Sequence, residues 1–301
     1  MSYTRAFVPV DGGRLSAVDF GGAGPDVLFI AGHGYLATSW TQVAAHLGPD
    51  VHAVALDHRQ HGPGLAPLTT GDTEWHDVIK AIDTLGLTDV VAVGHDMGAF
   101  MALAAAAERP DLIRGVVTVD GEYADRRGSK RYSAATECGA DMLDQLRIRF
   151  RFGDVLRGGD QVAEYLAQMR QVAETDWLVR GAGAQYEADA QYALRELPDG
   201  SFLRTPSPDA VVFGYEFSES AKYHPAFELY GHVTVPIDIM HCRDGNASSD
   251  PEMLRVLSSQ HANIHLHVVQ SGTVPQYACP QTVAEIVLEA TARIQPSPQR
   301  R

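Results

Sequence analysis

The chain has 301 residues, 45% of them hydrophobic, which is enough for one large domain or for a core domain with an insertion. A net charge of −14 argues against a nucleic acid or an anionic membrane as partner. No apolar run has the length of a signal peptide or a membrane span, and the three cysteines show no CxxC or metal spacing. We therefore expect a cytoplasmic protein that binds a small-molecule substrate. The oligomeric state stays open.

Strand and helix patterns alternate along the first 120 residues. Residues 14–20 alternate like an early antiparallel strand. Short apolar, β-branched runs predict buried strands, and the segments between them predict helices. The strands are expected at 27–31, 52–56, 89–93 and 115–119, and the helices at 38–47, with Thr38 as N-cap, 73–85 and 100–108.

The pattern changes between residues 123 and 232, which are richer in charged and aromatic side chains. Helices are expected there over 134–150, 161–172 and 183–197, and Pro198-Asp199-Gly200 predicts a turn between short strands. The earlier rhythm returns with strands at 235–241 and 264–270 and helices at 251–259 and 282–294.

Alternation on both sides of one insertion predicts an α/β fold with a doubly wound, mostly parallel sheet. Residues 1–122 and 233–301 are expected to form the core, and residues 123–232 a mainly helical cap. Ligands of such sheets bind at the carboxyl ends of the strands, so the cap is expected to cover that edge.

The segment VGHDMGAF, residues 93–100, joins a buried strand to an Ala-rich helix. Gly94 and Gly98 lack a Cβ and allow the two elements to approach closely. The pattern small-x-nucleophile-x-small is that of a nucleophile elbow, with Asp96 in the place of the nucleophile. The N-terminus of the following helix favours the ionised carboxylate.

Three motifs together resemble the α/β-hydrolase superfamily. They are GHDMGA, AGHGYLATSW and DHRQHGPG, each placed after a predicted strand. The resemblance covers residues 5–122 and 233–295 and implies the α/β-hydrolase fold. With an aspartate at the elbow, the chain resembles epoxide hydrolases and dehalogenases, in which this aspartate forms an alkyl-enzyme ester. Met97 departs from both patterns, because Trp or Arg often follows the nucleophile.

An epoxide is favoured over a halide because the insertion is rich in tyrosine, and an opening epoxide needs a proton. Residue order alone does not select the donor among these tyrosines. They are Tyr165, Tyr186, Tyr192, Tyr215, Tyr223 and Tyr230. Tyr186 and Trp177 are the candidates for substrate contact within the insertion.

The general base of the family is missing at its usual place. The resemblance implies a histidine in the loop after the last strand, where this chain has Thr273. A threonine hydroxyl is not a base near neutral pH. Asp244 matches the acid that normally orients that histidine, and Asp120 and Glu122 are alternative carboxylates at the same edge.

His33 is the strongest candidate for a substitute base. Aligned back from Trp40, Ala31-Gly32 stand in the place of the family's His-Gly and His33 takes the oxyanion-hole position. The backbone N–H groups of His33 and Met97 are expected to face Asp96. His95, just before Asp96, is expected to pack behind the turn.

Three hypotheses remain open. The first is an epoxide-hydrolase-like enzyme with Asp96 as nucleophile. The second is a cofactor-free isomerase, lyase or cyclase with Asp96 as general acid/base. The third is a small-ligand binding protein. None needs a metal or a nucleotide cofactor, because no HxxEH, CxxC or GxGxxG occurs in a suitable setting.

Overall fold

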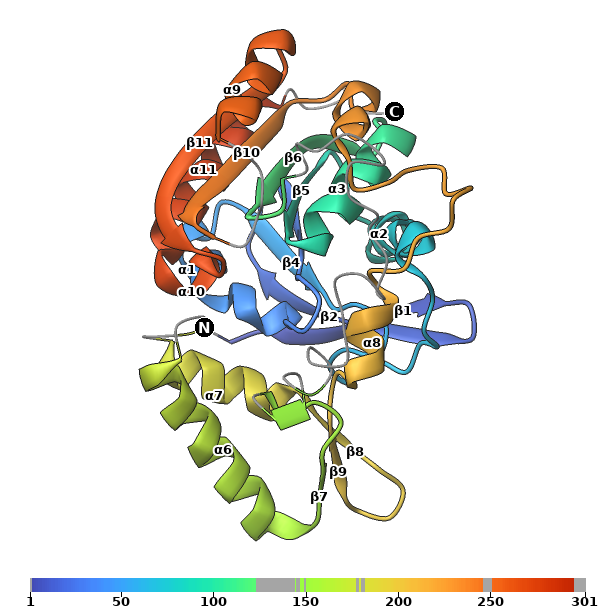
Figure 1. Ribbon diagram of the computed structural model, residues 1–301, viewed down its shortest axis with the longest axis vertical. Helices are drawn as coiled ribbons and strands as arrows, with labels where there is room; N and C mark the ends of the chain where they lie inside the picture. The colour runs from blue at the N-terminus through green and yellow to red at the C-terminus, as the bar shows by residue number, and fades with distance from the viewer. Residues whose placement is uncertain are drawn as a thin grey trace.

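The computed structural model describes residues 2–122, 144, 147–148, 150–176, 179, 182–245 and 251–294. A large sheet with helices on both faces occupies one end of the molecule, and a smaller unit lies at the other end (Figure 1). Within the described ranges, no helix has the length and apolarity needed to cross a membrane.

The large sheet has eight strands in the order β1-β2-β4-β3-β5-β6-β10-β11. β2 pairs antiparallel with β1 and with β4, and the remaining pairs are parallel. The strands are β1 (Thr4–Val10), β2 (Gly13–Gly21), β3 (Asp26–Ile30), β4 (His52–Leu56), β5 (Val90–His95), β6 (Ile113–Val119), β10 (Ile237–Asp244) and β11 (Ile264–Gly272). The expected α/β-hydrolase fold, with a mostly parallel sheet, is confirmed.

Helices cover both faces of this sheet, which makes it doubly wound (Figure 1). One face buries α2 (Gly71–Leu85), α3 (Met97–Glu108) and α9 (Pro251–Gln260) in one apolar cluster. The other face buries α1 (Thr41–Leu47) and α11 (Pro280–Arg293) in a second cluster. The alanines of α3 are buried on all sides, and their small side chains let this helix lie close to the strands.

Two details at helix ends differ from the expectation. The first helical segment begins with the 3-10 helix η1 (Ala37–Trp40), which Leu36 precedes, so Thr38 is not its N-cap. The last strand is followed by a one-turn helix, α10 (Pro275–Ala278), before α11.

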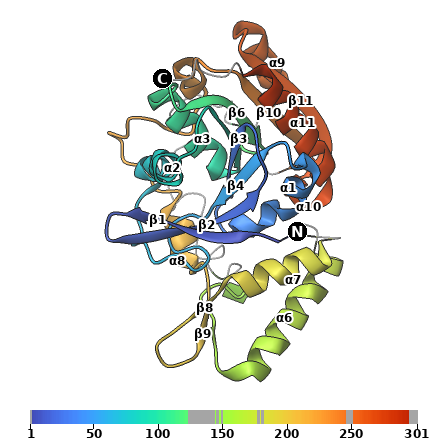
Figure 2. The same ribbon diagram turned by 180° about the vertical axis from the view of Figure 1, so that it is seen from behind.

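The insert, defined as residues 123–232, contributes no described strand to the large sheet. Its described residues form a three-stranded sheet, β7-β9-β8, and three helices besides the 3-10 helix η2. Their bounds are β7 (Val155–Leu156), α6 (Gly158–Thr175), α7 (Gly183–Tyr192), β8 (Leu194–Glu196), β9 (Phe202–Arg204), α8 (Pro208–Phe213) and η2 (Phe227–His232). Seen from either side, α6, α7 and the small sheet lie together beyond β1 and β2 (Figure 2).

The turn expected at residues 198–200 is confirmed, since it joins the antiparallel strands β8 and β9. The helix expected over 183–197 ends instead at Tyr192, because residues 194–196 pair with β9. Most of the helix expected over 134–150 falls outside the described residues. Tyr223, Leu229 and Tyr230, near the end of the insert, pack into the apolar cluster of α2 and α3.

Candidate active site

Asp96 occupies a sharp turn between β5 and α3. Its φ of 49° and ψ of −124° lie in a region that side chains other than glycine rarely adopt. A Cβ on Gly98 would lie 2.5 Å from the Ile30 carbonyl oxygen, and one on Gly94 would overlap the backbone of Gly98. The close approach inferred from these two glycines is confirmed, and it holds the Asp96 carboxyl at the strand ends.

The carboxyl group of Asp96 faces a cavity of about 180 Å³ between the core and the insert. The core supplies His33, Gly34, Tyr35, Leu36, His95, Asp96, Thr273 and Tyr277. The described insert supplies Phe150, Phe152, Val179, Tyr186, Asp189, Ala190, Arg204, Val211 and Tyr215. Apolar and aromatic side chains with a few polar groups are typical of a site for a small organic molecule.

Tyr215 brings a phenol from the insert to Asp96. It lies two residues beyond the end of α8, and its hydroxyl donates a hydrogen bond of 2.8 Å to Oδ2 of Asp96. A backbone hydrogen bond from Gly71 to the Glu216 carbonyl ties the next residue to the start of α2. The phenol can therefore supply a proton beside the Asp96 carboxyl group.

The other tyrosines of the insert have different environments. Tyr192 donates to Asp57 (2.6 Å), Tyr223 donates to Glu108 (3.2 Å), and Tyr230 is buried in the core. Tyr186 lines the cavity, and Tyr165 is fully buried inside the insert. Among the described tyrosines of the insert, only Tyr215 is bonded to Asp96.

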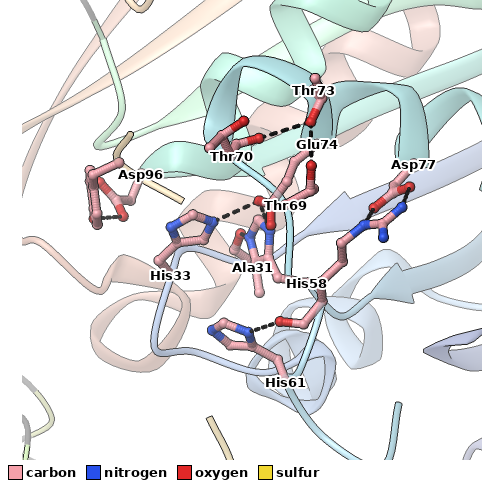
Figure 3. Close-up of polar contacts among 12 residues, drawn as sticks. Ala31, His33, His58, His61, Thr69, Thr70, Thr73, Glu74, Asp77 and Asp96 are labelled. Atoms are coloured by element: carbon pink, nitrogen blue, oxygen red, sulfur yellow. Dashed lines mark hydrogen bonds and ion pairs between the residues drawn. The ribbon is translucent and has the colours of Figure 1, made fainter. Parts of the chain in front are cut away.

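His33 lines the cavity and is held by Glu74 of α2 (Figure 3). Its Nε2 lies 3.0 Å from Oε2 of Glu74, and both side chains are almost completely buried. A carboxylate only accepts hydrogen bonds, so Nε2 of His33 carries a proton and Nδ1 is the ring nitrogen that can act as a base. Nδ1 has no hydrogen-bond partner among the described residues.

A second imidazole contacts the same carboxylate. Nδ1 of His58 lies 3.4 Å from Oε2 of Glu74, and its Nε2 donates to the Ala31 carbonyl. Burial raises the pKa of Glu74, but His33 and His58 outweigh burial and hold that pKa well below its ordinary value. Glu74 is therefore an ionised carboxylate between two imidazoles, as in a base whose orientation is fixed by an acid.

These three side chains are also the described residues most suited to a metal ion, because one ligand atom from each lies within 4.8 Å of the others. His61 is adjacent but differently engaged: its Nε2 accepts from the Gly34 N–H and its Nδ1 donates to the Arg59 carbonyl. Burial, with the charges of His58 and His33, lowers the pKa of His61 well below its ordinary value.

The position at which the family base was expected holds Thr273, and its backbone is hydrogen-bonded to another histidine, His95. Thr273 lines the cavity, and its carbonyl oxygen accepts a hydrogen bond of 2.7 Å from Nε2 of His95. The amide of Gln276 lies 3.3 Å from Nδ1 of the same ring. His95 lines the cavity beside Tyr35, so the expectation that it packs behind the turn is wrong.

The remaining predicted site residues are dispersed. Asp244 is exposed at the end of β10, accepts a hydrogen bond from Gln270 and does not line the cavity. Met97 begins α3 with its side chain buried in the core. Tyr186 lines the cavity, whereas Trp177 lies outside the described residues. The oxyanion role of the His33 and Met97 N–H groups stays a prediction.

Residue order did not single out Glu74, His58 or Arg204. Glu74 looks like an ordinary acidic residue in the first turn of a helix, where it complements the helix dipole. His58 follows a strand in the sequence, and its only signal was its place at the sheet edge. Arg204 is one arginine among many, and nothing short of the fold shows that it is buried.

Comparison with known proteins establishes the family. The sequence profile described as "Alpha/beta hydrolase family" matches residues 27–286. The chain belongs to the alpha/beta hydrolase family. An alpha/beta hydrolase crystallised as E-2-(acetamidomethylene)succinate hydrolase superposes with a TM-score of 0.74 over 97% of this chain and all of that one. At 18% identity this likeness concerns the fold alone.

Curated relatives of this alpha/beta hydrolase are hydrolases. An epoxide hydrolase of Caballeronia sordidicola is 34% identical over 142 residues, 42% of this chain and 41% of the relative. A 2-(acetamidomethylene)succinate hydrolase of Mesorhizobium japonicum is 29% identical over 46% of this chain and 51% of its own length. The chain thus spans about half the length of these relatives, or less. They support a hydrolase at the level of the family.

Proposed function

We propose that this alpha/beta hydrolase opens epoxides of small hydrophobic or aromatic molecules with Asp96 as nucleophile. The observation that carries the proposal is the hydrogen bond between Tyr215 and Asp96, in a cavity that also contains His33. The epoxide hydrolase among the relatives supports the choice of substrate class. In this reading the turn at Asp96 is a nucleophile elbow and the insert is a cap.

The first step forms an ester. A carboxylate oxygen of Asp96 attacks an epoxide carbon, the bond from that carbon to the ring oxygen breaks, and the released oxygen takes the proton of the Tyr215 hydroxyl. Tyr215 fits this role because its hydroxyl lies 2.8 Å from Oδ2 of Asp96, and its hydrogen bond passes from the carboxylate to the epoxide oxygen when the substrate is bound. The product of this step is a hydroxyalkyl ester of Asp96.

The second step hydrolyses the ester. Nδ1 of His33 removes a proton from a water molecule, which attacks the carbonyl carbon of the ester and releases the diol. Glu74 orients the imidazole and stabilises its charged form, as the acid of a triad does. The proton returns from His33 to Tyr215 through the solvent in the cavity, so one epoxide and one water give one diol.

Turnover of racemic styrene oxide in H₂¹⁸O tests this proposal. We expect diol formation and ¹⁸O in the peptide that contains Asp96, because water attacks the ester there. Asp96→Asn should lose activity by about four orders of magnitude, since an amide is a much weaker nucleophile. Asp160→Asn, on the exposed first turn of α6, is the matched control and should behave as the wild type. Diol formation without label in Asp96 contradicts the ester.

A second candidate is favoured by one observation: Thr273 and His95 fill the place of the usual base. Asp96 and Tyr215 then act as a general acid/base pair in an isomerisation, elimination or ring closure, without an ester. Intact mass separates the two candidates. An adduct on Asp96 after a single turnover supports the hydrolase, and conversion of substrate with no adduct in any variant supports acid/base chemistry.

A further inference from the structure

Arg204, the last residue of β9, carries a buried guanidinium in the wall of the cavity. Only 3% of the residue is exposed. Its Nη1 donates to the Thr205 carbonyl, and the Phe152 ring lies 4.7 Å from its Cζ. Its Nε is buried and has no hydrogen-bond partner among the described residues. Arginine is rarely buried this deeply unless an acid accompanies it.

The acids near Arg204 are engaged with other groups. The carboxylate of Asp154 pairs with Arg151 at 2.7 Å. Asp189, in the same cavity wall, accepts hydrogen bonds from Gln185 (2.8 Å) and Tyr277 (2.5 Å). No described carboxylate forms an ion pair with Arg204, although the charge of Arg204 lowers the pKa of Asp189 against the larger effect of burial. Among the described residues, the positive charge of Arg204 therefore lacks a direct counter-ion.

The neighbours of this guanidinium are phenols. Tyr165 lies beside Arg204, whose guanidinium lowers the pKa of this phenol against the larger effect of burial, and Tyr165 does not line the cavity. Tyr186 lines the same cavity. Burial raises the pKa of both phenols, so each keeps its O–H as a donor. An oxygen anion is the ligand that a guanidinium and the Tyr186 hydroxyl satisfy together.

The fold of the insert does not require this charge. The backbone N–H of Arg204 donates to the Asp154 carbonyl, and its own carbonyl accepts from Gly153. The strand pairing of β9 with β7 and β8 therefore depends on backbone groups. A buried charge that the strand pairing does not need is typical of a ligand-binding residue.

We propose that Arg204, with Tyr186, binds a carboxylate group of the substrate. The assignment of the cavity to a substrate rests on the proposed function, but the binding of the carboxylate does not depend on chemistry at Asp96. The substrate class becomes a small hydrophobic or aromatic carboxylate, with its acid group at the insert wall and its reactive carbon at the core wall.

Titration calorimetry with phenylacetate and its neutral isostere 2-phenylacetamide tests this proposal. We expect wild-type protein to bind phenylacetate at least about tenfold more tightly than the amide, as a charge-assisted hydrogen bond requires. Arg204→Met should lose that preference and weaken phenylacetate by at least about tenfold. Arg151 also carries a positive charge, which lies over the ring of Tyr165 and outside the cavity. The control variant Arg151→Met should therefore bind phenylacetate like the wild type.

The same titration on Asp96→Asn separates this proposal from the proposed function. If phenylacetate binds that variant with the wild-type preference but no epoxide is opened by the wild type, the carboxylate site stands and the function fails. Equal affinity of wild-type protein for the acid and the amide overturns the site, and this comparison needs no variant. Equal affinity of folded Arg204→Met and wild type for phenylacetate also overturns it.

Discussion

Two buried glutamate–histidine pairs flank the turn at Asp96, and they differ in what surrounds them. Glu74 contacts His33 and His58, and His33 opens onto the cavity. Glu122, in the loop after β6, pairs with His241 of β10, and neither residue lines the cavity. Gly121 lies against the backbone of Asp96, so this second pair is also close to the turn. A buried acid–imidazole pair thus marks a base only where a substrate can reach it.

The pKa values of the two glutamates are also shifted in opposite directions. His33 and His58 outweigh burial and lower the pKa of Glu74, whereas burial raises the pKa of Glu122 against a single opposing imidazole. The hydrogen bond with Glu122 in turn raises the pKa of His241. Two imidazoles oppose burial at Glu74, whereas at Glu122 one imidazole opposes both burial and the charge of Asp120.

The largest expected effect concerns turnover. His33→Gln should reduce epoxide hydrolysis by about 10²- to 10⁴-fold, because no general base then faces the water. His241→Gln should retain turnover within a few-fold. Steady-state kinetics measure the contrast, and intact mass should show an alkylated Asp96 in His33→Gln only. A base role for His33 is refuted when both variants turn over equally.

A second pair of variants changes the proposed proton donor, Tyr215, instead of the proposed base. Tyr215→Phe removes the hydroxyl at Asp96 and should lower the rate of ester formation by about 10²-fold or more. Tyr223→Phe is the matched control, since its hydroxyl contacts Glu108 away from the cavity. Single-turnover kinetics separate ester formation from ester hydrolysis. Equal rates in the two variants exclude Tyr215 as the proton donor.

The two histidine variants should rank in the opposite order when stability is measured instead of turnover. His241→Gln takes the imidazole from a buried carboxylate and should lower the free energy of unfolding by about 3 kcal/mol. His33→Gln leaves His58 beside Glu74 and should cost about 1 kcal/mol. Urea denaturation measures both values. A larger loss in His33→Gln contradicts the view that Glu74 shares two imidazoles.

The acid limb of stability should distinguish the glutamates. The folded pKa of Glu74 is lowered, so its contribution is present above the ordinary value of 4.5 and is lost as the pH falls. The melting temperature of the wild type should therefore fall further between pH 5 and pH 3 than that of Glu74→Gln.

For Glu122, whose folded pKa is raised, the contribution to stability is present below pH 4.5 and is lost as the pH rises. The melting temperature of Glu122→Gln should therefore fall less between pH 4 and pH 7 than that of the wild type.

The core and the turn could be predicted because their signals are local. Apolar, β-branched runs of about five residues identify buried strands whatever lies beside them. The turn at Asp96 was visible because Gly94 and Gly98 stand within four residues of each other. Within the insert, short strands were expected beside the turn at 198–200, but the preceding helix was expected to reach residue 197. It ends at Tyr192 because residues 194–196 pair with a strand that lies further along the chain.

The rest of the site could not be predicted because it is assembled over long sequence separations. Tyr215 and Asp96 are 119 residues apart, and His33 and Glu74 are 41 apart. His33 was predicted from its place in a motif, but its acid was sought at Asp244, which the fold leaves exposed. Choosing one tyrosine of six depends on how the insert packs on the core, and residue patterns do not encode that contact.

The smallest expected effect is that of restoring the family histidine. Thr273→His should change hydrolysis by less than about tenfold, because Asp244 is bonded to Gln270 and His95 already occupies the Thr273 carbonyl. Diol formation from styrene oxide measures it. A gain of several orders of magnitude that Asp244→Asn removes would show that the usual pair can still form, and that His33 is dispensable.

The close contact between Gly214 and the His33 ring has a consequence for the whole site. Gly214 has an ordinary helical φ of −67°, so its backbone does not require glycine. A Cβ at this position would nevertheless overlap the His33 imidazole. Even a single methyl group here would displace the ring from Glu74, on a segment whose next residue is Tyr215. A position with no side chain therefore limits where the His33 ring can lie beside Glu74 and Tyr215.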